Sequence, residues 1–306
     1  MRTELVQSHL HEQDSERHGR RLYLKPENLQ SIGAFKLRGA YNKIASLTDE
    51  ERSHGVISYS SGNHAQGVAY AARALGTKAV IVMPNNAPAI KREATAALGA
   101  EIVLVGPSSD ERMLKAQELA AEHGYVIVPP YDDEKIIAGQ GTMGLEILED
   151  LPEVETVLVP VGGGGMISGI ATAIKLTKPA AKVIGAEPEL AADAQASLRS
   201  GKIVQFTAEQ VTRTMADGLR TQSVGLINFE HIRRYVDDIV TVSEDEIREA
   251  MRRLAGDPKT VAEPSGAVAV AAFLFHRDEL PKTTMNVAVI SGGNIEPQML
   301  AEICGR

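Results

Sequence analysis

Short apolar runs alternate with helical segments along the first half of this chain, and that alternation constrains the fold more than any other feature. The runs Val56–Tyr59, Ala79–Met83 and Ile102–Val105 have the length and composition of buried strands. A glycine directly after a helix tolerates the left-handed backbone found there and marks the helix end. Three helical segments follow the strands and stop at such glycines: His64–Leu75 before Gly76, Ala89–Leu98 before Gly99, and Asp110–His123 before Gly124.

The second half of the chain continues the same pattern. Thr156–Val161, Val183–Ala186 and Asn286–Ile290 are apolar throughout, so both of their faces are expected to be buried. Short strands of this kind, placed between helices, predict a doubly wound α/β fold whose parallel sheets are covered by helices on both sides.

The composition narrows the class of partner and compartment. The 306 residues are enough for one large domain or two interlocked ones. A net charge of −8 argues against nucleic acid or an anionic membrane surface as the main partner. No run reaches the roughly 18 apolar residues of a membrane span. The single cysteine, Cys304, cannot form an internal disulfide, which favours a reducing cytoplasm.

Four consecutive glycines, Gly162–Gly165, follow the expected strand Thr156–Val161 and open a helical segment. Without side chains, their backbone N–H groups can converge on an anion at the positive end of the helix dipole. No Gly-Lys-Ser/Thr follows, so the loop is not a P-loop, and it lacks the dinucleotide-binding pattern. A tight structural turn is the alternative, and an anion site is the interpretation that we prefer.

Three further patches are suited to the same ligand. Lys36 lies in the apolar stretch Ile32–Leu37, where a desolvated amine has a lowered pKa and becomes nucleophilic. Ser60–His64 and Ser291–Asn294 follow strands, at the edge where open α/β sheets bind ligands. Taken singly, these patches are a surface lysine, a helix cap and a tight turn. Taken together with the glycines, they are what a protein needs to hold pyridoxal phosphate.

On these motifs together, the chain resembles the serine/threonine dehydratase and serine racemase family of fold-type-II pyridoxal-phosphate enzymes. The resemblance runs from about Leu22 to Ile295. It implies a tryptophan synthase β-like fold with two open, twisted, parallel-rich sheets flanked by helices. It also implies a small domain of residues 55–131, a large cofactor-binding domain of residues 1–54 and 132–306, and a homodimer.

The resemblance also assigns roles to the motif residues. Lys36 attaches the cofactor and takes the Cα proton of the substrate, and Ser61 matches a serine that acts on the opposite face in racemases. Asn63 resembles the residue that bonds the ring hydroxyl, and Ser291 the one that bonds the pyridine nitrogen. Further cofactor contacts are expected from Phe35, Gly162, Gly163, Gly164, Gly165 and Met166. Substrate contacts are expected from Ser60, Ser61, Gly62, His64 and Arg112.

A divalent-cation site of the racemase-like branch matches Glu187, Ala191 and Asp193. Two carboxylates, one backbone carbonyl and waters are hard oxygen ligands that suit Mg²⁺ or Ca²⁺. Spacing alone favours two solvated surface acids, so the cation is an expectation of the resemblance.

The expected activity is that of a pyridoxal-phosphate-dependent dehydratase, or ammonia-lyase, which converts L-serine or L-threonine to a 2-oxo acid and ammonia by β-elimination. 3-Hydroxyaspartate is a further substrate if Arg112 meets its distal carboxylate; an exposed ion pair within Asp110–Arg112 is the rival role. Serine racemase, alone or beside lyase activity, is the close alternative. A non-catalytic amino-acid sensor on the same fold would be expected to lack Lys36.

Overall fold

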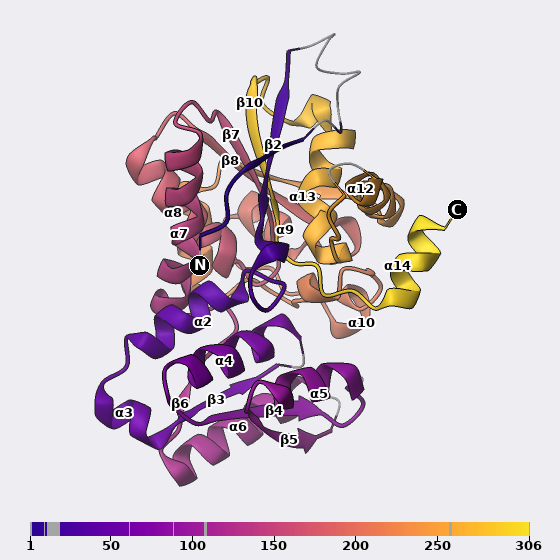
Figure 1. Cartoon of the computed structure of the whole chain (residues 1–306). Coiled ribbons are helices and arrows are strands. Elements are labelled where there is room, and N and C mark those ends of the chain that lie inside the picture. The colour runs from indigo at the N-terminus through magenta and orange to yellow at the C-terminus, as the bar shows by residue number, and fades with distance from the viewer. Residues whose placement is uncertain are drawn as a thin grey trace. The chain divides into compact units, whose positions relative to one another are not determined.

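The computed structural model describes residues 2–8, 10, 19–60, 62–87, 89–106, 109–256 and 259–305. They form two compact units, Met1–Phe35 with Gln140–Arg306, and Lys36–Gly139. Each unit is built around a sheet of its own (Figure 1). The predicted small domain, residues 55–131, falls within the second unit, and its limits stay a prediction.

The first unit contains a six-stranded sheet with the strand order β1-β2-β10-β7-β8-β9. The strands are β1 (Val6–Ser8), β2 (Arg21–Pro26), β7 (Thr156–Pro160), β8 (Lys182–Pro188), β9 (Asp238–Val242) and β10 (Met285–Ile290). β1 is antiparallel to β2, and the other neighbours are parallel. Figure 1 shows β2 and β10 side by side, although most of the chain separates them in sequence.

Helices cover both faces of this sheet. The helices along this part of the chain are η1 (Glu27–Leu29), α7 (Glu134–Asp150), α8 (Gly165–Thr177), η2 (Glu189–Ala191), α9 (Asp193–Ser200), α10 (Ala208–Val211), η3 (Asp217–Leu219), α11 (Leu226–Tyr235), α12 (Glu244–Gly256), α13 (Pro264–Phe275), η4 (Arg277–Glu279) and α14 (Pro297–Cys304). One buried cluster contains side chains of α12 and α13, and a second contains side chains of α7, α8 and α11.

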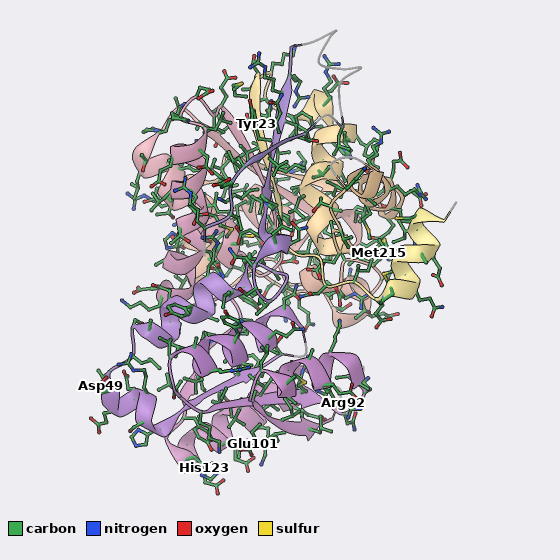
Figure 2. All side chains as sticks on the ribbon, viewed as in Figure 1. Tyr23, Asp49, Arg92, Glu101, His123 and Met215 are labelled. Carbon is green, nitrogen blue, oxygen red and sulfur yellow. The ribbon has the colours of Figure 1, made fainter. Side chains whose placement is uncertain are left out.

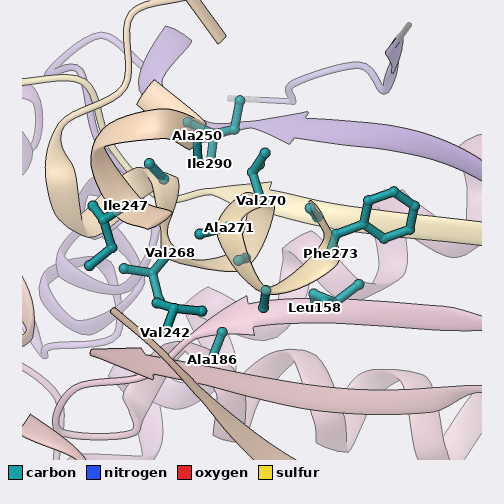
Figure 3. Close-up of a cluster of buried hydrophobic side chains, with 14 of the residues drawn as sticks. Leu158, Ala186, Val242, Ile247, Ala250, Val268, Val270, Ala271, Phe273 and Ile290 are labelled. Atoms are coloured by element: carbon teal, nitrogen blue, oxygen red, sulfur yellow. The ribbon is translucent and has the colours of Figure 1, made fainter. Parts of the chain in front are cut away.

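The strands supply both clusters because successive side chains point to opposite faces of a sheet. Leu158 of β7 lies in the first cluster, whereas Val157 and Val159 lie in the second. Figure 3 shows the first cluster, with Val268 and Phe273 of α13 near the strands. Each fully buried side chain of this size stabilises the fold by about 1.5–3 kcal/mol relative to its exposed state. The apolar runs Thr156–Val161, Val183–Ala186 and Asn286–Ile290 therefore become strands that are buried on both sides. The run Ile102–Val105 was also expected to be buried, but it forms a partly exposed strand at the edge of the other sheet.

The second unit contains a four-stranded parallel sheet with the order β5-β4-β3-β6. Its elements are α2 (Lys36–Ala45), α3 (Asp49–His54), β3 (Val56–Tyr59), α4 (Asn63–Ala74), β4 (Ala79–Pro84), α5 (Ala89–Ala97), β5 (Glu101–Val105), α6 (Ser109–His123) and β6 (Val126–Ile127). Ile57, Val80 and Val82 form its core with Ala116 of α6. Figure 2 shows Asp49, Glu101 and His123 on the outside of this unit, and all three are exposed.

The helix-ending glycines behave as the sequence predicts. Gly76, Gly99 and Gly124 all have positive φ, at 68°, 93° and 73°, and lie within two residues of the ends of α4, α5 and α6. Within the described ranges, none of the helices is both long enough and apolar enough to span a membrane.

Candidate functional site

The segment that leads into Lys36 is hydrogen-bonded to the turn after β10. The segment is residues 32–35, the turn is Ser291–Asn294, and both belong to the first unit. Three hydrogen bonds join them: Phe35 N–H to Ser291 O (3.0 Å), Gly293 N–H to Gly33 O (2.9 Å), and Asn294 Nδ2 to Ile32 O (2.8 Å). Ala34 and Gly292 also form an isolated β-bridge. Two motifs that lie far apart in the sequence are therefore one structural element.

Lys36 follows this segment as the first residue of α2. Its Nζ donates a hydrogen bond to the carbonyl oxygen of Pro130 at 2.6 Å. The residue keeps part of its surface exposed, but protein atoms surround the amine, and this burial lowers the pKa of Lys36 to about 8. An appreciable fraction of the amine is then neutral near physiological pH, which is the form that attacks a carbonyl carbon.

The turn after β3 opens α4 in the second unit. Gly62 is the N-cap and Asn63 the first helical residue, while Ser60 accepts a hydrogen bond from Gly62 N–H at 3.3 Å. Ser61, the predicted second proton-transfer residue, lies outside the described residues. The first N–H groups of a helix have no partner within the helix, so this turn can receive a carboxylate.

His64 lies in the first turn of α4, where its side chain bonds to the protein backbone. Its ring is buried, and its Nε2 lies 3.0 Å from the carbonyl oxygen of Val128. Because a carbonyl only accepts, Nε2 must carry the proton. Burial, and then the positive charge of Lys36, lowers the pKa of His64 to about 3. The imidazole is therefore neutral at physiological pH, and its predicted contact with substrate stays a prediction.

The glycine loop joins β7 to α8 in the first unit. Within the described part of the chain, the N–H groups of Gly162, Gly163 and Gly164 donate no hydrogen bond. A Cβ atom at Gly162 would lie 3.2 Å from Leu219 Cα. Gly165 begins α8, and the next residue, Met166, is buried. These N–H groups lie at a helix N-terminus without an acceptor among the described residues, and there is little room for a side chain at Gly162, so the loop is suited to a phosphate group.

Ser291 directly follows β10 and is 3% exposed. Its hydroxyl donates a hydrogen bond to the carbonyl oxygen of Ser265 at 3.3 Å, and the hydroxyl of Ser265 accepts one from Gly218 N–H at 2.9 Å. A bond of 3.3 Å is long for a hydroxyl donor, so the Ser291 hydroxyl can turn to another acceptor at low cost.

The three predicted cation ligands lie together at the carboxyl end of β8. Glu187 lies near the end of β8, Ala191 belongs to η2, and Asp193 begins α9; all three are buried. The Glu187 carboxylate accepts hydrogen bonds from the N–H groups of Ala194 (3.1 Å) and Gln195 (2.8 Å). The spacing of Glu187 and Asp193 in the sequence favoured two solvated surface acids. That interpretation is wrong, because both side chains are buried.

The charges of this acidic pair are poorly compensated. Burial, and then the charge of Asp193, raises the pKa of Glu187 well above its ordinary value. Burial raises the pKa of Asp193 to about 7, against the opposing effect of nearby backbone N–H groups. Among the described residues, neither carboxylate oxygen of Asp193 has a hydrogen-bond partner of good geometry. The donor set is therefore two buried carboxylates that a cation would neutralise.

Arg112 lies in the described part of α6, in the second unit, and burial lowers the pKa of its guanidinium. The side chain is partly buried, whereas the neighbouring Glu111 is exposed. Its contact with a distal carboxylate stays a prediction, as does the rival ion pair.

Several groups at these loops have no signature in the sequence. The carbonyl oxygens of Pro130 and Val128 accept hydrogen bonds from Lys36 and His64. Because any residue type can supply a backbone carbonyl, the sequence does not mark these two. Asn228 of α11 donates a hydrogen bond to the glycine loop, and its only signal in the sequence is a polar residue among the apolar positions of a helix.

Comparisons with known proteins match nearly the whole chain. The profile of a family described as "Pyridoxal-phosphate dependent enzyme" matches residues 2–292. L-threonine ammonia-lyase of Thermotoga maritima is 48% identical over 292 residues, which are 95% of this chain and 72% of that protein. L-threo-3-hydroxyaspartate ammonia-lyase of Saccharomyces cerevisiae is 44% identical over 289 residues, 94% of this chain and 87% of that protein. The solved structure of maize serine racemase is similar with a TM-score of 0.93 and 38% identity, over 99% of this chain and 91% of that one.

Proposed function

The chain belongs to the pyridoxal-phosphate dependent enzyme family, and we propose that it is an ammonia-lyase acting on small β-hydroxy amino acids. The observation that carries the proposal is the lowered pKa of the Lys36 amine, about 8. It occurs in a chain that is 48% identical to an L-threonine ammonia-lyase. The preferred substrates are L-threonine and L-serine. The products are a 2-oxo acid and ammonia.

The residues at the site fit pyridoxal phosphate. The N–H groups of Gly162–Gly164 have no acceptor among the described residues and can donate hydrogen bonds to the phosphate. The amine of Lys36 can react with the aldehyde carbon. Asn63 and Ser291 are proposed to bond the ring hydroxyl and the pyridine nitrogen. Further contacts are proposed for Phe35, Gly165 and Met166. When bound, the cofactor supplies an electron-withdrawing ring that stabilises negative charge at the substrate Cα.

Lys36 is proposed to move the Cα proton of the substrate. A base is most effective when its pKa lies near the working pH, and a pKa of about 8 meets that condition. The substrate carboxylate is proposed to bind at the N-terminus of α4, where Gly62 caps the helix. Ser291 offers a neutral hydroxyl, which does not hold the pyridine nitrogen protonated as a carboxylate would. That weaker electron sink favours elimination of the β-hydroxyl over transamination.

Two variations on this chemistry have their own support. The similarity to maize serine racemase supports racemisation as a second activity, with Ser61 returning the proton on the face opposite Lys36. The similarity to the yeast 3-hydroxyaspartate enzyme supports a second substrate, whose distal carboxylate Arg112 would meet.

We also propose that Glu187, Asp193 and the carbonyl of Ala191 hold a divalent cation, Mg²⁺ or Ca²⁺. The support is the pair of buried carboxylates, one with both oxygens unsatisfied among the described residues. A cation there would neutralise two charges that burial otherwise disfavours, so its role is to stabilise the end of β8. A homodimer in the cytoplasm is likewise a proposal, which light scattering and cell fractionation would test.

A coupled assay of 2-oxo acid formation tests the proposed function. Purified protein is supplied with pyridoxal phosphate and each isomer of serine, threonine and 3-hydroxyaspartate, and the unreacted substrate is analysed on a chiral column. Turnover of L-threonine or L-serine to the oxo acid is expected. Racemised substrate without oxo acid would make racemisation the principal activity. No turnover of any isomer by cofactor-loaded protein would refute both.

A further inference from the structure

One carbonyl group of the glycine loop is held by two donors. The oxygen of Gly163 accepts a hydrogen bond from Asn228 Nδ2 at 2.7 Å and another from Gly225 N–H at 3.1 Å. Gly225 is the N-cap of α11, and Asn228 lies in its first turn with its side chain fully buried. Both donors come from one helix end of the first unit, so this carbonyl is turned toward α11.

The direction of that carbonyl fixes the direction of the next N–H group. In a planar trans peptide, the C=O of one residue and the N–H of the next point in opposite directions. Because Gly163 O points toward α11, Gly164 N–H points away from it. Gly164 N–H is one of the groups that donates no hydrogen bond within the described ranges. The two donors therefore fix the direction of an N–H group, at the N-terminus of α8, that has no acceptor among the described residues.

Packing holds the same peptide in place. Gly164 has a φ of 93°, and a Cβ atom there would lie 2.9 Å from Asn228 Cβ. The backbone oxygen of Asn228 also accepts a hydrogen bond from the Ser168 hydroxyl of α8 at 3.2 Å. Asn228 therefore joins the loop and two helices, and its amide is the side-chain donor to Gly163.

We infer that Asn228 is a positioning residue for the cofactor phosphate, on the premise that this chain binds pyridoxal phosphate as proposed. Its side-chain amide holds the Gly163–Gly164 peptide so that Gly164 N–H is aimed at the phosphate group. The residue itself does not touch the phosphate. A hydrogen bond to a charged acceptor depends strongly on direction, so a loosened peptide weakens phosphate binding specifically.

The test compares two ligands that differ only in the phosphate. Binding of pyridoxal phosphate and of pyridoxal to the full-length, cofactor-stripped protein is measured by absorbance for the wild type, Asn228→Val and Asn228→Thr. The two variants have the same shape, and only threonine offers a donor. Asn228→Val should weaken pyridoxal phosphate binding about tenfold, the equivalent of one hydrogen bond to a charged group, and leave pyridoxal binding unchanged. Asn228→Thr should show a smaller loss.

A matched control and the contrary outcomes make the test decisive. Thr172→Val removes another contact between α8 and α11, the 2.8 Å bond to His231 Nδ1, and should leave the ratio of the two affinities unchanged. Equal weakening of both ligands, equal loss in the valine and threonine variants, or no loss at all would each overturn the role of Asn228. Failure of the wild type to bind either ligand would instead refute the proposed function.

Discussion

The side-chain amide of Asn294 donates a hydrogen bond to the carbonyl oxygen of Ile32 at 2.8 Å, which attaches the segment before Lys36 to the end of β10. The same side chain fills the space beside Gly33. A Cβ atom at Gly33 would lie 2.4 Å from Asn294 Oδ1, and Gly33 has a φ of 71°. Gly33 is therefore required twice, by its backbone conformation and by the asparagine beside it.

We expect Gly33→Ala to destabilise the protein by about 2 kcal/mol, from left-handed strain and the displaced Asn294 hydrogen bond. Gly201 is a matched control, because its φ is 70° and a Cβ atom there would have no neighbour within 4 Å. Gly201→Ala should cost only about 1 kcal/mol, measured by urea unfolding. In an Asn294→Ala background, the cost of Gly33→Ala should fall to that of Gly201→Ala. Equal costs for both glycines in the wild-type background would contradict the proposed packing.

Borohydride treatment of cofactor-loaded protein should attach the cofactor permanently to Lys36, as peptide mass spectrometry would show. Lys36→Ala should abolish lyase turnover, because it removes both the attachment point and the base. Lys43 lies further along the same helix and is paired with Asp133, so Lys43→Ala is the control. Labelling of any lysine other than Lys36 would contradict the assignment.

The stability of the cofactor-free protein should depend on the protonation of Lys36. Its pKa is lowered from 10.5 to about 8 in the folded state, so the unfolded chain binds more protons between these values. The contribution of Lys36 to the free energy of unfolding therefore rises with pH from about 8 to 10.5. Lys36→Met should remove this slope and be more stable than the wild type at pH 7.

Urea unfolding at a series of pH values would measure that slope. Lys135 is exposed on α7, and Lys135→Met should leave the pH dependence unchanged. The same slope in the wild type and in Lys36→Met would show that the Lys36 amine is solvated.

Removal of a divalent cation should lower the melting temperature, since a ligand bound only to the folded state stabilises it by mass action. Glu187→Gln should abolish the sensitivity to chelator, because it removes one of the two buried charges. Glu189 is the control, as an exposed acid of η2 next to the proposed site. Glu189→Gln should remain sensitive. A chelator without effect, and no metal in the purified protein, would count against the cation.

The Ser61→Ala substitution should lower racemisation and elimination to different extents. Only racemisation needs a proton donor on both faces of the substrate, and one general acid–base group contributes roughly 10²–10⁴-fold. Racemisation of serine should therefore fall much further than elimination from L-threonine. Ser60→Ala is the neighbouring control and should affect both activities to a similar extent. A matched fall in both activities of Ser61→Ala, with a raised KM, would make Ser61 a substrate-binding residue.

The fold was predictable because local signals agreed with one another. Val56–Tyr59 is a strand with the predicted bounds, and Gly76, Gly99 and Gly124 end the helices that they were expected to end. The α/β class, the fold-type-II relationship and the pyridoxal-phosphate family are confirmed. The strands β1, β2, β6 and β9 were missed. β1 and β6 have only two or three residues and give no periodicity to detect, whereas β2 and β9 interrupt their apolar residues with polar ones.

The site was predictable only as a set of motifs. Lys36, the glycine loop and Ser291 carry their chemistry in residue type, so the sequence identifies them as candidates. Their individual roles stay predictions, as do the cation and the substrate contacts. The groups that orient them depend on tertiary packing: Pro130 contributes a carbonyl, and Asn294 and Asn228 contribute amides whose partners lie far away in the sequence.

The central place of β10 has a consequence for synthesis on the ribosome. β10 lies between β2 and β7, and the turn after it holds the segment before Lys36. At about 5–20 residues per second, the ribosome needs roughly 10–50 s after Phe35 to reach Ser291. During that interval the nascent chain can complete the contiguous Lys36–Gly139 unit, but not the sheet of the first unit. A nascent chain should therefore gain affinity for the cofactor only once its C-terminal strand has emerged.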